Sequence, residues 1–416
     1  MTTVGLREHL THRGNLRSSR FGWLRLTPMY SVHLVDELLD DAGDVERVLD
    51  PYCGTGTTAL VCAERGTDAD TLDINPFLLW LTRAKTQVYE PEEIAAASTF
   101  ARVVEEAILT TAGGCPWIPA ISNIERWWGE DTLAALARAW DAIGAAAQVG
   151  SQGSSDLLAI AFLRIVIRTA SVSFGHQSMS FRGRAGEVAR AQLSLEGGRA
   201  GVVAEEWSSA VREIAAAAAS PIATQPRAVL GDARDLTALG AGRYDLVITS
   251  PPYCNRMSYI RELRPYMYWL GYLKERVDAA ELDWQAIGGT WGSATSRVGR
   301  WMPTDADPKV RVDGFDLVVA GIARSSDLLA RYVHKYFTDT ARHVASLPAV
   351  LNRGARVNYI IGNSKFYDTL VPTEAILASL LREARFDDIE VRVIRKRTSK
   401  KELFEYLVSA RWDDEL

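Results

Sequence analysis

The chain has 416 residues, 47% hydrophobic and 24% charged, a balance typical of a soluble globular protein with one large core or two domains. No apolar run is long enough to span a bilayer and the first residues form no hydrophobic secretory segment, so we expect a cytoplasmic protein without a membrane partner. The four cysteines and six histidines show no metal-ligand spacing, so we expect no metal site.

Positive charge gathers at two places along the chain, although the net charge is −5. Five arginines lie in the segment that ends at Arg25, and six basic residues lie in the stretch 392–401. Each cluster alone fits a solvated surface as well as it fits a phosphate-binding one. Because the charge is segregated, the negative net charge does not exclude an anionic polymer as a partner.

Strand-like apolar runs that end in turn residues alternate with helical patterns along the chain. This alternation favours a mostly parallel, doubly wound α/β sheet. The expected strands are 47–50, 70–76, 227–235, 244–253 and 355–364. Near the C-terminus, the segments IEVRVIRKR and FEYLVSARW are expected to pair as an antiparallel hairpin.

A long alanine-rich departure separates the second expected strand from the third. Residues 91–222 carry a helical period punctuated by Gly- and Pro-containing loops, which predicts a helical insertion. The sheet domain is then expected in two parts, residues 1–90 and 223–416. Within the second part, residues 254–350 show an irregular pattern.

The first expected strand runs into the sequence LDPYCGTGTTAL, residues 49–60. Gly54 and Gly56 allow a ligand to approach the backbone, and the start of the following helix offers unpaired amides. The loop lacks the Lys-Ser/Thr of a phosphate-binding P-loop and the third glycine of the dinucleotide fingerprint. It therefore disfavours a nucleoside triphosphate or NAD as the ligand.

Two acids follow later strands. Asp73 ends the second strand, where a carboxylate suits the two hydroxyls of a ribose; an N-cap for the helix after Pro76 is the alternative. Asp232, in VLGDAR, is placed to accept from the amino group of an adenine, with a purely capping role as its alternative. Because strand ends meet at one edge of an open α/β sheet, the acids and the glycine loop together predict a nucleoside cofactor.

The fourth expected strand ends in Ser250-Pro251-Pro252-Tyr253. The two prolines remove two backbone donors, so the chain leaves the sheet ladder at a rigid corner. This corner carries a hydroxyl on one side and an aromatic ring on the other. Cys254, which follows directly, is interpreted as a packing residue.

With DPYCGTGTT upstream and TSPPY downstream, the chain resembles the amino-group methyltransferases that use S-adenosylmethionine. Their motif Asp/Asn/Ser-Pro-Pro-Tyr/Phe is paired with an Asp-Pro-Phe-x-Gly-x-Gly-Thr-Thr-like loop, in which this chain has Tyr52 in place of the usual Phe. The serine version looks like the branch that acts on the N4 amino group of cytosine in DNA. Members that act on adenine N6 more often begin the motif with Asp or Asn.

The resemblance implies a Rossmann-like, doubly wound, mostly parallel seven-stranded sheet with a C-terminal antiparallel hairpin and a helical insertion. It also implies S-adenosylmethionine as the cofactor. The residues that it assigns to the cofactor are Asp50, Cys53, Gly54 and Gly56 at the methionine end, Asp73 at the ribose, Ile74 and Asp232 at the adenine, and Thr27 and Pro28 in a flanking N-terminal motif.

The chemistry of an exocyclic amino group explains the residue types at the corner. Its nitrogen is a poor nucleophile, because the lone pair is delocalised into the ring. Two acceptors, the Ser250 hydroxyl and the Pro251 carbonyl, would favour a pyramidal nitrogen with its lone pair turned toward the methyl group. Pro252 helps to fix the corner, and Tyr253 offers a face for an extruded base, a stacking worth roughly 1–3 kcal/mol.

The resemblance therefore implies a site-specific methyltransferase of double-stranded DNA. Such an enzyme can be paired with a cognate restriction endonuclease, and the sequence leaves open whether this one is. We expect recognition to be shared between 91–222 and 254–345. The second region interleaves basic with aromatic residues: Arg256, Arg261, Arg264 and Lys274 with Tyr259, Tyr266, Trp269, Trp291 and Trp301. For each of these residues, packing of an amphipathic helix with a solvated stripe is the alternative. Three alternatives stay open: an adenine-N6 DNA methyltransferase, an RNA amino-methyltransferase, and a non-catalytic cofactor-binding subunit of a DNA-processing assembly.

Overall fold

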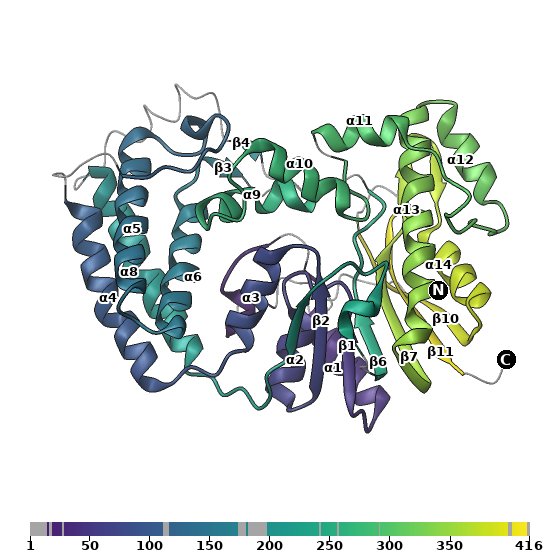
Figure 1. Ribbon diagram of the computed structural model, residues 1–416, viewed down its shortest axis with the longest axis horizontal. Helices are drawn as coiled ribbons and strands as arrows, with labels where there is room; N and C mark the ends of the chain where they lie inside the picture. The colour runs from purple at the N-terminus through teal and green to yellow at the C-terminus, as the bar shows by residue number, and fades with distance from the viewer. Residues whose placement is uncertain are drawn as a thin grey trace.

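The computed structural model describes residues 15, 19–26, 29–110, 116–173, 180–181, 198–240, 243–255, 258–290, 292–397 and 402–413. A central sheet lies beside a helical bundle, and α9 (Tyr259–Trp269) and α10 (Arg276–Gln285) extend between the two (Figure 1). The sheet carries every strand end that the sequence singles out.

Seven strands form the main sheet in the order β10-β11-β7-β6-β1-β2-β5. Pairs β1/β2, β1/β6, β2/β5 and β6/β7 are parallel, whereas β11 is antiparallel to both β7 and β10. The predicted fold class and its C-terminal hairpin are confirmed. The strands are β1 (Arg47–Asp50), β2 (Asp68–Asp73), β5 (Arg227–Leu230), β6 (Tyr244–Thr249), β7 (Leu351–Gly362), β10 (Phe386–Lys396) and β11 (Phe404–Trp412).

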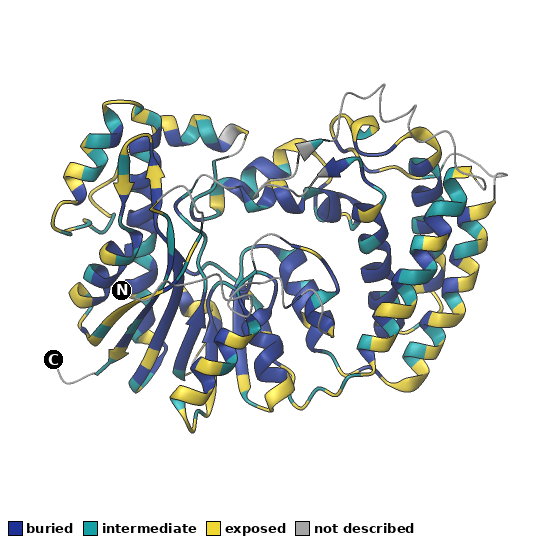
Figure 2. Cartoon of the chain, turned by 180° about the vertical axis from the view of Figure 1, so that it is seen from behind, coloured by how far each residue is buried: buried dark blue, intermediate teal, exposed yellow. Residues whose placement is uncertain are grey.

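Alternate residues of the central strands face two different apolar cores. Val48 and Leu246 pack in one cluster with α1 (Val32–Ala42) and α2 (Thr57–Arg65). Leu49 and Val247 pack in a second cluster with α13 (Asp327–Ser346) and α14 (Thr373–Glu383). Because successive side chains of a strand point to opposite faces, both faces of the sheet are covered, as a doubly wound fold requires. Figure 2 shows the central strands largely buried.

The alanine-rich region folds into four long helices that pack on one another. They are α4 (Pro91–Leu109), α5 (Glu130–Ala147), α6 (Gln152–Arg168) and α8 (Gly198–Ala218). Their core is continuous with that of α3 (Pro76–Thr86) and α9, since Leu81, Phe162 and Trp269 belong to one buried cluster. The bundle therefore supports α9, the helix that follows the Ser-Pro-Pro-Tyr corner.

Arg20 ties the N-terminal segment to two helix ends. The residue is 1% exposed, and its side chain donates to the carbonyls of Lys85 and Gln87 at the end of α3 and of Ala217, Ala218 and Ser220 at the end of α8. These are carbonyls that a helix leaves without internal donors. The interpretation of Arg20 as part of a surface basic cluster is therefore wrong.

The remaining described elements are short or lie around the periphery. They are η3 (Arg20–Gly22), η4 (Ile124–Arg126), β3 (Val172–Ser173), β4 (Ser180–Phe181), η5 (Leu236–Leu239), α11 (Ser293–Arg300), α12 (Phe315–Ala323), η6 (Leu347–Ala349), β8 (Ser364–Phe366) and β9 (Thr369–Val371). Across the described residues, no helix has the length and apolar character to cross a membrane. The same residues contain no cluster of three or more His, Cys, Asp or Glu that would suit a metal ion.

Candidate functional site

The carboxyl ends of the parallel strands are joined to one another by short hydrogen bonds. The Cys53 amide donates to the Leu72 carbonyl at 2.9 Å, and the Gly231 amide donates to the Asp73 carbonyl at 3.1 Å. The Thr249 hydroxyl donates to Asp50 Oδ1 at 2.6 Å. The structure thus brings the glycine loop, the two later acids and the Ser-Pro-Pro-Tyr corner to one edge of the sheet.

The glycine loop turns so tightly that it needs both glycines. Gly54 and Gly56 have φ values of 52° and 73°, which disfavour residues with a side chain. A Cβ on Gly56 would also lie 2.5 Å from Thr82 Oγ1 of α3. Cys53 is fully buried with its sulfur 3.0 Å from the same Thr82 oxygen. Its amide donates to the Leu72 carbonyl and its carbonyl accepts from the Gly56 amide, so Cys53 fixes the shape of the loop.

Asp50 is buried inside the protein, at 1% exposure. Its carboxylate accepts from the Tyr30 and Thr249 hydroxyls and from the Tyr52 amide. Burial raises the pKa of Asp50 to about 6, although these hydrogen bonds oppose the shift. Asp50 therefore fixes the loop against β6 with its side chain, and its carboxylate has its partners within the protein.

Asp73 is half-buried at the end of β2, next to half-buried Ile74. Its two oxygens accept from the backbone amides of Gly54 at 3.0 Å and Asn75 at 2.9 Å. Burial raises the pKa of Asp73 to about 6 despite these bonds. The N-cap of α3 is Asn75, which accepts from Phe77, so the alternative that gave this role to Asp73 is wrong.

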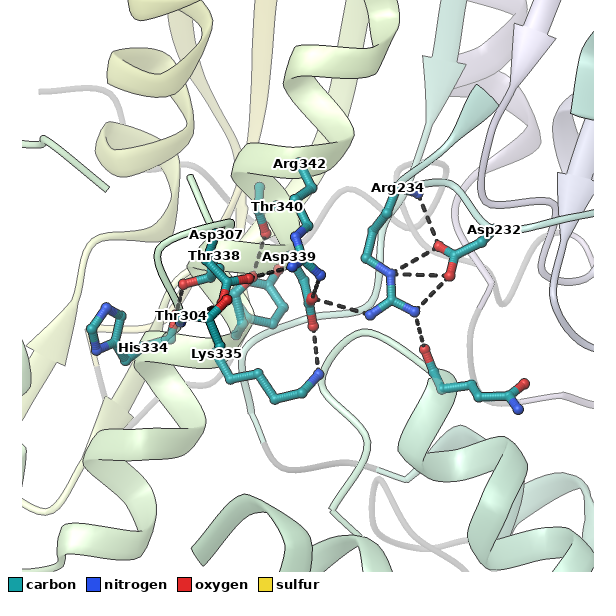
Figure 3. Close-up of polar contacts among 12 residues, drawn as sticks. Asp232, Arg234, Thr304, Asp307, His334, Lys335, Thr338, Asp339, Thr340 and Arg342 are labelled. Carbon is teal, nitrogen blue, oxygen red and sulfur yellow. Dashed lines mark hydrogen bonds and ion pairs between the residues drawn. The ribbon is translucent and has the colours of Figure 1, made fainter. Parts of the chain in front are cut away.

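Asp232 lies after β5 in an ion-pair network with Arg234 (Figure 3). The Arg234 guanidinium donates to both Asp232 oxygens, to Asp339 of α13 and to the Gln285 carbonyl, and Lys335 also donates to Asp339. Burial would raise the pKa of Asp232, but the bonds and charge of Arg234 outweigh it and lower the pKa. Arg234 thus fastens the region around α10 and α13 to this strand end.

Ser250 and Pro251 present oxygens at the end of β6. The Ser250 hydroxyl donates to the Ile360 carbonyl of β7 at 2.9 Å. Since its hydrogen is committed there, the Ser250 oxygen offers only acceptor lone pairs to a further partner. Within the described part of the chain, the Pro251 carbonyl accepts no hydrogen bond. The corner therefore offers two acceptors, the arrangement that complements an amino group.

Pro252 and Tyr253 are held by helices and by the C-terminal hairpin. The Tyr336 hydroxyl of α13 donates to the Pro252 carbonyl at 2.7 Å. The Tyr253 hydroxyl donates to Glu405 Oε1 at 2.8 Å, and the Arg397 guanidinium carbon lies 5.0 Å from the centre of the Tyr253 ring. Burial, together with Glu405, raises the pKa of Tyr253 well above its ordinary value. The prolines thus fix the backbone of the corner, and the C-terminal hairpin, distant in sequence, fixes the position of the Tyr253 ring.

Sequence reasoning missed Lys85, which lies beneath the glycine loop at 1% exposure. Its ammonium donates to the Thr55 carbonyl at 3.0 Å, and burial lowers the pKa of Lys85 to about 8. The signal was present in the helical spacing, since Leu78, Leu81 and Lys85 recur on one buried face of α3. Tyr336 and Glu405 were also missed, because nothing local marks them.

Several predicted contact residues have other positions. Tyr266 and Trp269 are 2% and 0% exposed in the core that joins α9 to the bundle, so their prediction as stacking platforms for DNA is wrong. Arg261 and Lys274 are exposed, and Arg264, Tyr259 and Trp301 are half-buried. Cys254 is fully buried, in agreement with a packing role. Thr27, Pro28, Arg256 and Trp291 lie outside the described residues.

Comparison with known proteins gives a short match to methyltransferases. Type II methyltransferase M.AvaI from Nostoc sp. and the protein of the same name from Anabaena variabilis are each 29% identical to this chain over 72 residues. The match spans 17% of this chain and only 15% of the length of these relatives. No family model matches the chain.

A solved structure, the rRNA methyltransferase aviRa from Streptomyces viridochromogenes, aligns over 96% of both chains at 12% identity. Its TM-score of 0.31 is too low to define a shared fold. The class of the fold therefore follows from the strand order itself, an α/β protein with a mostly parallel seven-stranded sheet.

Proposed function

We propose that this chain is an S-adenosylmethionine-dependent methyltransferase that modifies the N4 amino group of cytosine in DNA. The observation that carries the proposal is the pair of acceptors at the end of β6, the Ser250 hydroxyl oxygen and the Pro251 carbonyl. Two acceptors without a donor complement an NH2 group and repel a carbonyl oxygen. The sequence similarity to the two M.AvaI proteins supports the reaction class, and the serine of the motif supports cytosine.

The glycine-loop edge fits the proposed cofactor. Each Asp73 oxygen holds one backbone amide, which orients the carboxylate and leaves further lone pairs for the hydroxyls of a ribose. Gly54 and Ile74 are half-buried beside it and offer backbone and apolar surface. When bound, S-adenosylmethionine supplies a methyl group carried by a sulfonium.

Asp232 would contact the adenine of the cofactor with a carboxylate that is already ion-paired to Arg234. Arg234 occupies both oxygens, so an adenine amino group would use a lone pair that this pairing leaves open. Asp50 and Cys53 would act indirectly, by fixing the shape of the loop, because both residues are buried.

The residues at the corner would act on the amino group by orienting it. Ser250 and Pro251 would each accept a hydrogen bond from one N–H of the amino group. These two bonds would favour a pyramidal nitrogen with its lone pair turned toward the methyl group. The bound cofactor would supply the methyl group and leave as its thioether, and the nitrogen would then release one proton to water. Tyr253 would stack the extruded base. The motif needs no strong general base, because the nitrogen would lose its proton only after it has gained the methyl group.

Methyl transfer from labelled S-adenosylmethionine to duplex DNA and to RNA of mixed sequence, followed by nucleoside analysis, tests the proposal. N4-methylcytosine in DNA is the expected product. N6-methyladenine would reassign the base, label confined to RNA would overturn the DNA assignment, and no transfer to either would overturn the reaction class.

Single-residue variants test whether the reaction takes place at this site. Ser250→Ala should lower turnover about 10²–10³-fold, the usual cost of one preorganised hydrogen-bonding group, while cofactor affinity is kept. Ser379→Ala, at a half-buried serine of α14 that bonds only the Ala375 carbonyl of its own helix among the described residues, is the matched control and should keep wild-type turnover. Asp73→Ala should weaken cofactor binding at least tenfold, measured by calorimetry. Wild-type turnover in Ser250→Ala would remove the proposed role of the corner.

A further inference from the structure

The ring of Tyr253 is fixed at its tip and across its face by the C-terminal hairpin. The hydroxyl donates to Glu405 Oε1 of β11 at 2.8 Å, and the Arg397 guanidinium carbon lies 5.0 Å from the ring centre. At the other end of the residue, the Tyr253 amide donates to the Tyr259 hydroxyl at 3.3 Å. A tyrosine that is held at both its backbone and its hydroxyl has little freedom to rotate about its two side-chain bonds.

Glu405 is itself held rigidly. Glu405 is 7% exposed. Its carboxylate accepts from Arg395 Nε at 2.6 Å and from Arg395 Nη2 at 3.2 Å. Arg395 and Glu405 are direct partners in the β10/β11 register. A bidentate arginine–carboxylate pair across two strands fixes the carboxylate in the plane of the fork. The hairpin thus presents one preset acceptor to the tyrosine.

Arg397 connects this support to the end of β7. Its Nη1 donates to the Asn363 carbonyl at 2.9 Å, and the Asn363 side chain bonds the Glu402 carbonyl and the Phe404 amide at the start of β11. The strand that receives the Ser250 hydroxyl and the hairpin that receives the Tyr253 hydroxyl are therefore one connected unit.

We propose that Glu405 is a positioning residue for the target base, which acts by holding the Tyr253 ring in the plane on which the extruded base stacks. The inference rests on the proposed function and adds a residue to it from the last strand of the sheet. A stacking platform contributes only when its plane is set before the base arrives, because a misplaced ring shifts the amino group away from Ser250 and Pro251.

Steady-state kinetics on DNA, with the full chain, test this assignment. Glu405→Ala should lower kcat/KM for DNA roughly tenfold to a hundredfold, the usual cost of a misplaced reacting group, and should leave the cofactor dissociation constant unchanged. Glu405→Gln keeps an oxygen that accepts from the tyrosine, so it should recover most of the loss. Glu390→Ala, at an exposed carboxylate of β10 in the same hairpin, is the matched control and should behave as wild type.

A double-mutant cycle separates positioning from mere support of the hairpin. Tyr253→Phe removes the same hydrogen bond from its other end without loss of packing volume, and it keeps the test open if Glu405→Ala does not fold. If Glu405 acts through the tyrosine hydroxyl, Glu405→Ala in the Tyr253→Phe background should cause no further loss.

The possible results are distinct from one another. Additive losses in the cycle, or wild-type kcat/KM in Glu405→Ala, would overturn the role of Glu405 while the proposed function stands. A wild-type chain that methylates no base in DNA overturns the proposed function first, before any variant is compared.

Discussion

The two halves of the candidate site are held in different ways. On the glycine-loop side, which comprises Asp50, Gly54, Gly56 and Asp73, the contacts join residues close in sequence, such as Gly54 to Asp73 with a separation of 19. On the corner side, which comprises Ser250 to Tyr253, the partners are Tyr336, Ile360 and Glu405, at separations of 84, 110 and 152. The Thr249 hydroxyl, next to the corner, donates to Asp50 and so links the two sides.

The difference indicates how each side acquires its shape. The glycine loop is held mainly by β1, β2 and α3, and its Asp50 is also bonded to Thr249 of β6. The corner side is complete only when β7, α13 and the C-terminal hairpin have all packed on β6. Substitutions on the glycine-loop side should therefore affect stability and cofactor binding together, whereas those on the corner side should affect turnover more selectively.

Gly56→Ala should give the largest effect on the glycine-loop side. The new Cβ meets Thr82 Oγ1 at 2.5 Å and Cγ2 at 2.9 Å, and the φ of 73° is itself unfavourable for alanine. We expect a loss of about 3 kcal/mol in the free energy of unfolding, with cofactor binding strongly weakened, measured by denaturant titration and calorimetry. Gly144→Ala, in α5 with open space around it, is the control and should be neutral or slightly stabilising. A wild-type unfolding midpoint in Gly56→Ala would contradict this account of the loop.

The sequence predicts the glycine-loop side well and the corner side only in part. Strand ends, glycines and acids are local signals, so the sheet, the hairpin and the gathering of Asp50, Asp73 and Ser250 follow from spacing alone. Glu405 and Tyr336 carry no local mark, because their importance arises from long-range packing. Long-range packing also explains the wrong predictions. In the sequence, Arg20 and Trp269 fit a nucleic-acid-binding surface, but in the structure Arg20 is bonded to helix ends and Trp269 is buried against the helical bundle.

Two buried groups, Asp50 on the glycine-loop side and His343 behind the corner side, should change the free energy of unfolding in opposite directions as the pH falls. Burial raises the pKa of Asp50 from 3.8 to about 6, so its stabilising contribution is full below pH 3.8 and is lost as the pH rises through 6. Burial lowers the pKa of His343, on the helix that holds Pro252, from 6.5 to about 4, so its contribution is full above pH 6.5 and is lost as the pH falls through 4.

Replacement of Asp50 and replacement of His343 should therefore change the pH dependence of the free energy of unfolding in opposite directions. Between about pH 4 and pH 6.5, Asp50→Asn should make acidification more destabilising than in wild type, and His343→Gln should make it less so, by about 2–3 kcal/mol each. Urea titrations across this range measure both slopes. His343→Gln keeps a donor for the Ala233 carbonyl and an acceptor for the Tyr359 hydroxyl, so the comparison isolates the charge. Equal slopes in all three proteins would refute the assignment of these two groups as opposed titrating sites.

Gly362→Ala should have the smallest effect on stability and should separate the two sides most clearly. A Cβ there would lie 2.5 Å from Arg397 Nη1 and 2.9 Å from Tyr253 Cε2, both of which belong to side chains that can shift. We expect a cost of about 1 kcal/mol in the free energy of unfolding, because the new methyl displaces side chains and not the backbone. Turnover on DNA should nevertheless fall roughly tenfold or more as the Tyr253 ring moves, while the cofactor dissociation constant stays at the wild-type value. Gly362→Ala thus reverses the pattern expected for Gly56→Ala. If it weakened cofactor binding as much as turnover, the two sides would have to be a single mechanical unit, joined more strongly than the Thr249–Asp50 hydrogen bond accounts for.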